Sequence, residues 1–127
     1  MRVLIVDDHP LFRDGLRSLL EVRGIDVVGE ASNGREGVDQ TRRLQPDVVL
    51  LDITMPTMSG LEAAQILKKE CPPVQVLIVS QHDSRGFQWA ALAAGVSGYV
   101  VKSKVGSDLI PELRRIQDMG RSIRKTS

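Results

Sequence analysis

The sequence predicts an α/β fold in which helices cover both faces of a parallel β-sheet. Short continuous apolar runs bounded by turn residues recur along the chain, and such runs are typical of strands buried on both faces. Between them lie stretches whose apolar residues recur with the period of a helix. Five strand–helix units in strict alternation indicate a parallel sheet. The 127 residues suffice for one such domain and are too few for two.

The first two units occupy the first third of the chain. Residues 3–6 are a continuous apolar run and predict a strand. Residues 10–23 follow with a helical period, a proline suited to the first turn and a glycine directly after the last. Residues 25–31 predict the second strand. Residues 33–45 predict the second helix, because Asn and Glu three apart form a capping motif at its start and a proline follows its end.

The next three strands and two helices follow the same rules. Residues 47–51 combine four apolar residues with a turn signal just beyond. The capping-box pattern Ser-Gly-Leu-Glu begins a helix over residues 59–67, which two prolines separate from a strand at 74–79. A serine can cap a helix over residues 84–94, which a glycine ends. Residues 98–101 predict a short fifth strand.

The last helix is expected to start at Ser107, a suitable N-cap, and to bury Leu109, Leu113 and Ile116. Pro111 is then expected near the first turn, where a missing amide proton does least harm. We expect residues 1–120 to form one domain, and residues 121–127 to be a basic tail or the start of a linker to an output domain absent from this chain.

Composition excludes several classes of protein. Hydrophobic residues are 42%, charged residues 26% and the net charge is +1, so disorder, a membrane protein and a strongly basic nucleic-acid binder are all disfavoured. No apolar segment is long enough to span a membrane. The single cysteine, Cys71, suits a reducing compartment, and its two following prolines predict an incidental loop residue. A cytoplasmic location is expected.

Chemically active side chains are predicted to meet at one edge of the sheet. The residues that follow parallel strands converge at the carboxyl edge, where this chain places Asp7, Asp8, Asp52, Ser80 and Lys102. Carboxylates this close repel one another unless a cation neutralises them. Hard oxygen ligands suit Mg²⁺, and no His or Cys residues have the spacing of a zinc site. His9 and His82 lie in loops near this edge and are expected to be exposed loop residues rather than ligands.

The chemistry that fits this set is attack of a carboxylate on phosphorus to give an aspartyl phosphate. Mg²⁺ would neutralise charge on the phosphoryl oxygens, Lys102 would pair with another oxygen, and the Ser80 hydroxyl could donate a hydrogen bond to a third. The alternative is that these residues are solvated polar groups that end strands. The coincidence of the whole set at strand ends favours the functional interpretation.

Three sequence blocks resemble the receiver domain of bacterial two-component response regulators. They are VDDHPLFRDGL at 6–16, LLDITMPTMSG at 50–60 and GYVVK at 98–102. The Asp-His-Pro start is similar to the subfamily whose receivers precede a LuxR/NarL-type helix-turn-helix domain. The resemblance covers nearly the whole chain and implies a flavodoxin-like (βα)5 domain with strand order 2-1-3-4-5.

The resemblance also implies roles for individual residues. Asp52 would be the phosphoacceptor, and Mg²⁺ would be held by Asp8 directly, by Asp7 through water, by Asp52 and by the backbone carbonyl of Thr54. Lys102 would bind the phosphoryl group. Ser80 would be the switch hydroxyl and Tyr99 the switch aromatic. The product would be a shape change, so the protein is expected not to be an enzyme beyond catalysing its own phosphorylation and dephosphorylation.

Partners follow from the same resemblance. The phosphoryl donor would be a phosphohistidine on a sensor histidine kinase. The altered surface would comprise the helix from Ser84, the last strand and the last helix, and it would control an output such as transcription. A homodimer could form through that surface or through the first and last helices. Trp89 lies off the apolar face of its helix and could be a partner contact. Neither nucleic acid nor membrane is expected to bind this domain alone.

Three positions depart from the family pattern or bear on timing. Ser103 follows Lys102 where many receivers have proline, and Gln81 follows Ser80 where small residues are common. Thr54 lies near the approach of an attacking water. Rival interpretations are a pseudo-receiver that binds partners without phosphorylation, a flavodoxin-like nucleotide or flavin binder, and a stand-alone receiver. The nucleotide binder is disfavoured because no Gly-rich phosphate loop follows the first strand.

Overall fold

The computed structural model describes residues 1–126, with side chains described as far as Gly120. A five-stranded sheet of order β2-β1-β3-β4-β5 forms its centre, and every neighbouring pair is parallel. The strands are β1 (Arg2–Val6), β2 (Asp26–Ala31), β3 (Val48–Leu51), β4 (Gln75–Ser80) and β5 (Gly98–Val101). This architecture confirms the parallel α/β sheet that the sequence pattern predicted, and the flavodoxin-like strand order that the resemblance to receiver domains implied.

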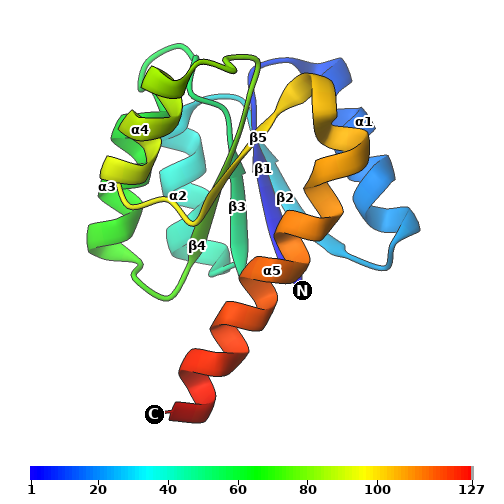
Figure 1. Cartoon of the computed structure of the whole chain (residues 1–127). Helices are drawn as coiled ribbons and strands as arrows, with labels where there is room; N and C mark the ends of the chain where they lie inside the picture. Colours follow the sequence, from blue (N-terminus) through cyan, green and yellow to red (C-terminus); the bar gives the residue numbers. More distant parts are fainter. Residues whose placement is uncertain (127) are drawn as a thin grey trace.

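Five α-helices connect and cover these strands. They are α1 (Pro10–Val22), α2 (Gly34–Leu44), α3 (Gly60–Glu70), α4 (Arg85–Ala93) and α5 (Val105–Thr126), and the short 3-10 helix η1 (Lys102–Lys104) precedes α5. Helices α1 and α5 lie on one face of the sheet and α2, α3 and α4 on the other (Figure 1). None of the helices that the structure describes is both long and apolar enough to cross a membrane.

The sheet separates two hydrophobic cores. Side chains from alternating strand positions pack with α2, α3 and α4 on one face, where Leu51, Leu67 and Ile78 are almost wholly buried. The opposite positions pack with α1 and α5, around Leu20 and Leu113. Burial on both faces explains why the strands are continuous apolar runs rather than alternating ones.

The helix caps confirm three sequence signals. The side chains of Asn33, Ser59 and Ser84 each accept a hydrogen bond from the backbone amide three residues later, at the starts of α2, α3 and α4. Each cap satisfies an amide that the helix leaves without a partner. These caps set the exit points of the loops that surround the carboxyl edge of the sheet.

The last helix corrects one prediction. It begins at Val105 rather than after a cap at Ser107, because η1 turns the chain directly into the helix. Ser107 instead donates to the carbonyl oxygen of Lys104. Pro111 therefore lies inside α5 rather than near its first turn. Helix α5 continues past residue 120, and the predicted tail at 121–127 stays a prediction; Ser127 is outside the described residues.

Cys71 corrects a second prediction. It is the C-cap residue of α3 and is 5% exposed, in contact with the core between the sheet and α3. Its backbone amide donates to Leu67 and its carbonyl accepts from Val74, so the segment before the two prolines folds inward. A buried thiol packs as a small apolar side chain.

Candidate functional site

The five polar residues predicted to share a crevice lie together at the carboxyl edge. Asp7 and Asp8 follow β1, Asp52 follows β3, and Lys102 opens η1 directly after β5. Ser80 is the last residue of β4 and is fully buried. The parallel register explains the convergence, since Val6 pairs with Leu51 and Ser80 with Val101.

The Lys102 side chain joins the two buried carboxylates. Its Nζ atom lies 2.8 Å from Asp7 Oδ2 and 3.1 Å from Asp52 Oδ2, and its side chain is 15% exposed. The ammonium also lies 4.4 Å from the centre of the Phe12 ring on α1. Burial alone would lower the pKa of Lys102, but the carboxylates of Asp7 and Asp52 outweigh it and raise the pKa. Lys102 is therefore a permanent cation at this edge.

Asp52 is buried at the end of β3, with 3% of its surface exposed. Burial raises the pKa of its carboxyl above the ordinary value; Lys102 opposes this shift and the nearby Asp7 carboxylate adds to it. The amide of Thr54 lies 3.4 Å from Asp52 Oδ1 as a donor. The Lys102 ammonium and the Thr54 amide are therefore the groups that offset part of the desolvation of this carboxylate.

Asp7 makes contacts through its carboxylate, its backbone amide and its backbone carbonyl. Its Oδ2 atom contacts Lys102, its Oδ1 atom accepts from the amide of His9 at 2.8 Å, and its backbone amide donates to Ala31. Its backbone carbonyl oxygen accepts from Arg13 Nη1 at 2.5 Å. Both carboxylate oxygens of Asp7 are therefore engaged by groups of this chain.

Asp8 differs, because its buried Oδ1 atom has no hydrogen-bond partner among the described residues. His9 Nδ1 lies 3.2 Å away without hydrogen-bond geometry. An unpartnered buried carboxylate oxygen is costly unless a cation binds it. Ligand atoms of Asp7, Asp8, His9 and Asp52 all lie within 4.8 Å of one another. Their carboxylate oxygens fit a hard cation such as Mg²⁺.

The predicted switch residues meet around His82, in the loop between β4 and α4. The Tyr99 hydroxyl donates to the carbonyl oxygen of His82 at 2.5 Å, and burial raises the pKa of Tyr99, with the Ser80 hydroxyl opposing the shift. The amide of His82 donates to Ser80 Oγ at 3.3 Å. The half-buried Tyr99 ring and the buried Ser80 hydroxyl are therefore already linked through this loop.

His82 itself was expected to be an exposed loop residue. The structure instead makes it half-buried, with its ring stacked on Phe87 at 4.0 Å between centroids and its Nε2 atom 3.0 Å from Thr54 Oγ1. It thereby ties the loop after β4 to the loop after β3. Its position two residues after Ser80 is the only sequence signal for this role.

Two further contributors were missed by sequence reasoning. Gly60 at the start of α3 packs directly against the backbone of Asp52. The one sequence signal for this contact was a glycine within the capping-box pattern, because glycine permits a close approach of two backbones. Arg13 contacts the backbone of Asp7, which the helical period of residues 10–23 does not predict. Both contacts are made to backbone atoms of a neighbouring segment, and residue type alone does not predict them.

Comparison with known proteins identifies the family. The response regulator receiver domain family matches residues 3–114. Transcriptional regulatory protein MctR of Rhizobium johnstonii is 35% identical over 121 residues, covering 94% of this chain and 56% of MctR. The nitrate/nitrite response regulator protein NarP of Escherichia coli K12 is 40% identical over 114 residues, covering 89% of this chain and 53% of NarP.

A solved structure agrees with these sequence relatives. The crystal structure of a LuxR-family two-component response regulator from Aurantimonas sp. SI85-9A1 superposes with a TM-score of 0.87 at 37% identity, covering 91% of this chain and 83% of that one. The chain spans about half the length of the curated relatives it matches. The chain therefore belongs to the response regulator receiver domain family, and within it to the LuxR/NarL type.

Proposed function

We propose that this receiver domain is a phosphorylation-dependent switch that accepts a phosphoryl group on Asp52 from a sensor histidine kinase. The observation that carries the proposal is the position of the Lys102 ammonium between the Asp52 and Asp7 carboxylates, beside the unpartnered oxygen of Asp8. This arrangement holds a nucleophile, a fixed cation and an unpartnered carboxylate oxygen together at one edge of the sheet.

Receiver domains bind Mg²⁺ at an acidic pocket, and the carboxylates here fit that ion. In the proposal Asp8, Asp52 and the backbone carbonyl of Thr54 hold the ion directly, and Asp7 holds it through water. When bound, Mg²⁺ supplies neutralisation of the negative charge on the phosphoryl oxygens. The Oδ1 atom of Asp8, which is buried and accepts no hydrogen bond from the described residues, supports its direct role.

The covalent step uses atoms that the chain presents. A carboxylate oxygen of Asp52 attacks the phosphorus of the phosphohistidine, the P–N bond breaks, and the departing imidazole takes up a proton. Lys102 pairs with a phosphoryl oxygen, as a point charge already within 3.1 Å of the acceptor carboxylate. The Ser80 hydroxyl, buried at the neighbouring strand end, donates to another.

The same geometry supports an output. Ser80 moving toward the phosphoryl group would change the support of the loop after β4, because the His82 amide donates to Ser80 Oγ. Tyr99, whose hydroxyl donates to the His82 carbonyl, would follow. A local charge would thus bias a two-state element and alter the surface of α4, β5 and α5.

The proposed output is control of transcription through a DNA-binding domain outside this chain, with the protein in the cytoplasm. The printed description of MctR as a transcriptional regulatory protein supports this, as does the half-length coverage of such relatives. In the proposal, the receiver domain by itself binds neither nucleic acid nor membrane. The alternative is a stand-alone receiver or a pseudo-receiver that acts by protein–protein contact.

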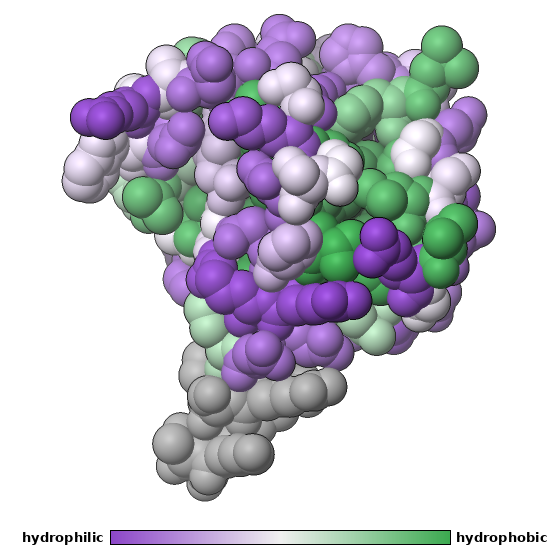
Figure 2. Space-filling model, turned by 45° about the vertical axis from the view of Figure 1, so that its right-hand side comes forward, coloured by the Kyte–Doolittle hydropathy of each residue, from purple (hydrophilic) through white to green (hydrophobic). Residues whose placement is uncertain are grey.

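The proposal includes a homodimer with two candidate surfaces. On the α1–α5 side, where apolar side chains gather between charged ones (Figure 2), Leu11 and Val22 are 87% and 82% exposed. On α4, Trp89 and Leu92 are 70% and 57% exposed. Separate Leu11→Asp and Trp89→Asp variants, studied by sedimentation velocity with beryllofluoride and Mg²⁺, identify the surface whose loss abolishes the dimer; a monomeric parent chain excludes both.

The central experiment is labelling of the chain by acetyl phosphate with Mg²⁺. The parent chain is expected to gain one phosphoryl group by intact mass, and Asp52→Asn is expected to gain none. Asp47→Asn, at the exposed amino end of β3, is the matched control and should label normally. Labelling of the Asp52 variant would show that the nucleophile is misassigned, and a parent chain inert to both acetyl phosphate and beryllofluoride would favour the pseudo-receiver.

A further inference from the structure

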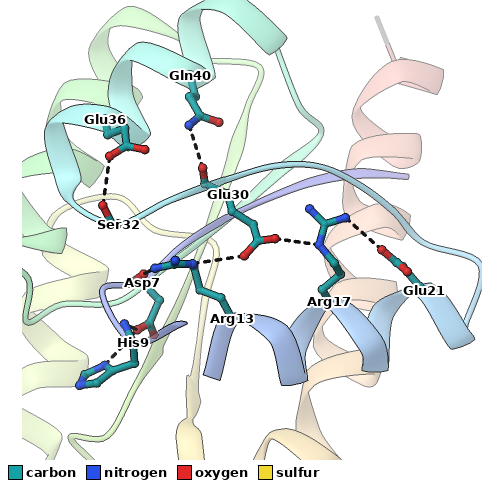
Figure 3. Close-up of polar contacts among 9 residues, drawn as sticks. All are labelled: Asp7, His9, Arg13, Arg17, Glu21, Glu30, Ser32, Glu36 and Gln40. Atoms are coloured by element: carbon teal, nitrogen blue, oxygen red, sulfur yellow. Dashed lines mark hydrogen bonds and ion pairs between the residues drawn. The ribbon is translucent and has the colours of Figure 1, made fainter. Parts of the chain in front are cut away.

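A polar network ties the acidic edge to the side of α1. The Arg13 guanidinium donates from Nη1 to the backbone carbonyl oxygen of Asp7 at 2.5 Å and from Nε to Glu30 Oε1 at 3.2 Å (Figure 3). Arg13 comes from the first turn of α1, and Glu30 from the carboxyl end of β2. The two side chains are only 18% and 25% exposed. The contact is therefore expected to contribute more to stability than an ion pair on the exposed surface does.

Glu30 is the centre of this network. Its Oε2 atom accepts from Arg17 Nε at 2.8 Å, and Arg17 continues to Glu21 at the exposed side of α1. Its backbone carbonyl accepts from Gln40 Nε2 at 2.8 Å, so α2 fixes the strand end from which the side chain projects (Figure 3). Glu30 thus presents one carboxylate oxygen to each of two arginines, and only Arg13 reaches the acidic edge.

We propose that Arg13 is a positioning residue for the acidic pair and that Glu30 orients Arg13. This inference rests on the proposed Mg²⁺ site. Arg13 anchors the backbone of Asp7 from the α1 side, at the residue from which the chain turns to present Asp8. Lys102 and the His9 amide hold only the carboxylate of Asp7. Releasing the carbonyl would let the peptide between Asp7 and Asp8 rotate and would displace the unpartnered Oδ1 atom.

The shape of the guanidinium matters more than its charge. A planar fork donates two hydrogen bonds in fixed directions, and the ammonium of lysine cannot reproduce both at once. Charge alone predicts the opposite result, since removing a cation beside a metal site should strengthen binding of Mg²⁺. Positioning and charge therefore differ in the sign of the effect that an Arg13 variant produces.

The test is the affinity of the unphosphorylated full chain for Mg²⁺, measured by isothermal titration calorimetry. Arg13→Lys keeps the charge and loses the fork, and we expect binding about tenfold weaker, as for loss of an outer-shell partner. Arg17→Lys is the matched control: Arg17 contacts the same Glu30 carboxylate but not Asp7, and its affinity should equal that of the parent chain. Arg13→Gln should also bind more weakly, despite the lost positive charge.

Three outcomes overturn the inference: parent-like affinity in Arg13→Lys, tighter binding in Arg13→Gln, or an equal loss in Arg17→Lys. If Arg13→Lys did not fold, Arg13→Gln decides, since charge alone predicts tighter binding there; weaker binding supports positioning, and parent-like or tighter binding overturns it. The ¹⁵N chemical shifts of the Asp8 and His9 amides in the metal-free state should move in Arg13→Lys and not in Arg17→Lys. A parent chain that binds no Mg²⁺ would instead refute the proposed metal site.

Discussion

Gly60 packs so closely on Asp52 that a Cβ atom at position 60 would lie 1.9 Å from the Asp52 carbonyl oxygen. The amide of Gly60 also donates to the carbonyl of Ile53 at 2.8 Å. The start of α3 therefore lies against the backbone that carries the proposed phosphoacceptor. Only a residue without a side chain permits this approach, because the obstructing atoms are backbone and cannot rotate away.

Gly60→Ala is accordingly expected to lower the free energy of unfolding by about 2–3 kcal/mol, as overpacking against rigid atoms does. It should also weaken binding of beryllofluoride with Mg²⁺, because the Asp52 peptide must shift. Urea denaturation and a beryllofluoride titration measure the two effects. Gly15→Ala is the matched control: Gly15 lies inside α1 with nothing within 4 Å of an added Cβ, so that variant should gain about 1 kcal/mol. Equal stability of the two variants would contradict the packing argument.

Asp52→Asn is expected to stabilise the metal-free fold at pH 7, since burial raises the pKa of Asp52. A raised carboxyl pKa means that the native state binds the proton more tightly than the unfolded chain. Its stabilising contribution is complete below the unfolded pKa and is lost as pH rises through the folded one. The advantage of the Asp52→Asn variant should therefore grow from acid to neutral pH.

Thermal unfolding between about pH 4 and pH 7, the range over which a raised carboxyl pKa acts, measures this trend. Asp14→Asn is the control, because Asp14 is exposed on α1. The melting temperature of this variant should stay close to that of the parent chain throughout the series. If the stability gained by Asp52→Asn were constant or shrank toward neutral pH, the effect of Lys102 on the pKa of Asp52 would outweigh that of burial.

Lys102→Met should destabilise the metal-free chain by about 3 kcal/mol, because it leaves the Asp7 and Asp52 carboxylates buried without their cation. The cost should be clearly smaller in the Asp52→Asn background, where one of the two charges is gone. A double-mutant cycle by urea denaturation measures this coupling. Additive effects would show that the contact between Lys102 and Asp52 has no energetic weight.

His82→Ala is expected to shorten the lifetime of phosphorylated Asp52. The His82 ring contacts Thr54 Oγ1 at 3.0 Å and stacks on Phe87. In this position the ring shields Asp52 from water that enters between the loops after β3 and β4. Opening this approach admits the attacking water. Loss of phosphate after removal of the donor gives the rate, and Gln88→Ala on α4 is the control. An unchanged lifetime would place the water path elsewhere.

Much of the fold could be predicted from local pattern. Apolar runs such as residues 3–6 and 47–51 match β1 and β3 to within a residue, because strands buried on both faces must be apolar throughout. Caps at Asn33, Ser59 and Ser84 indicated the helix starts correctly. The misplacement of the last helix start arose because Ser107 offers a capping side chain, while η1 makes that cap unnecessary.

Sequence pattern alone predicted which acidic, hydroxyl and lysine side chains lie at the carboxyl edge. Asp7, Asp8, Asp52, Ser80 and Lys102 each follow or end a strand, and the parallel register brings such positions to one edge. Their pairing depends on the folded structure, in which Lys102 bridges Asp7 and Asp52 and Arg13 donates to the Asp7 carbonyl. The buried Asp8 Oδ1 has no hydrogen-bond partner among the described residues. Local pattern encodes burial and strand ends, whereas hydrogen bonds between distant segments depend on distances that exist only once the chain has folded.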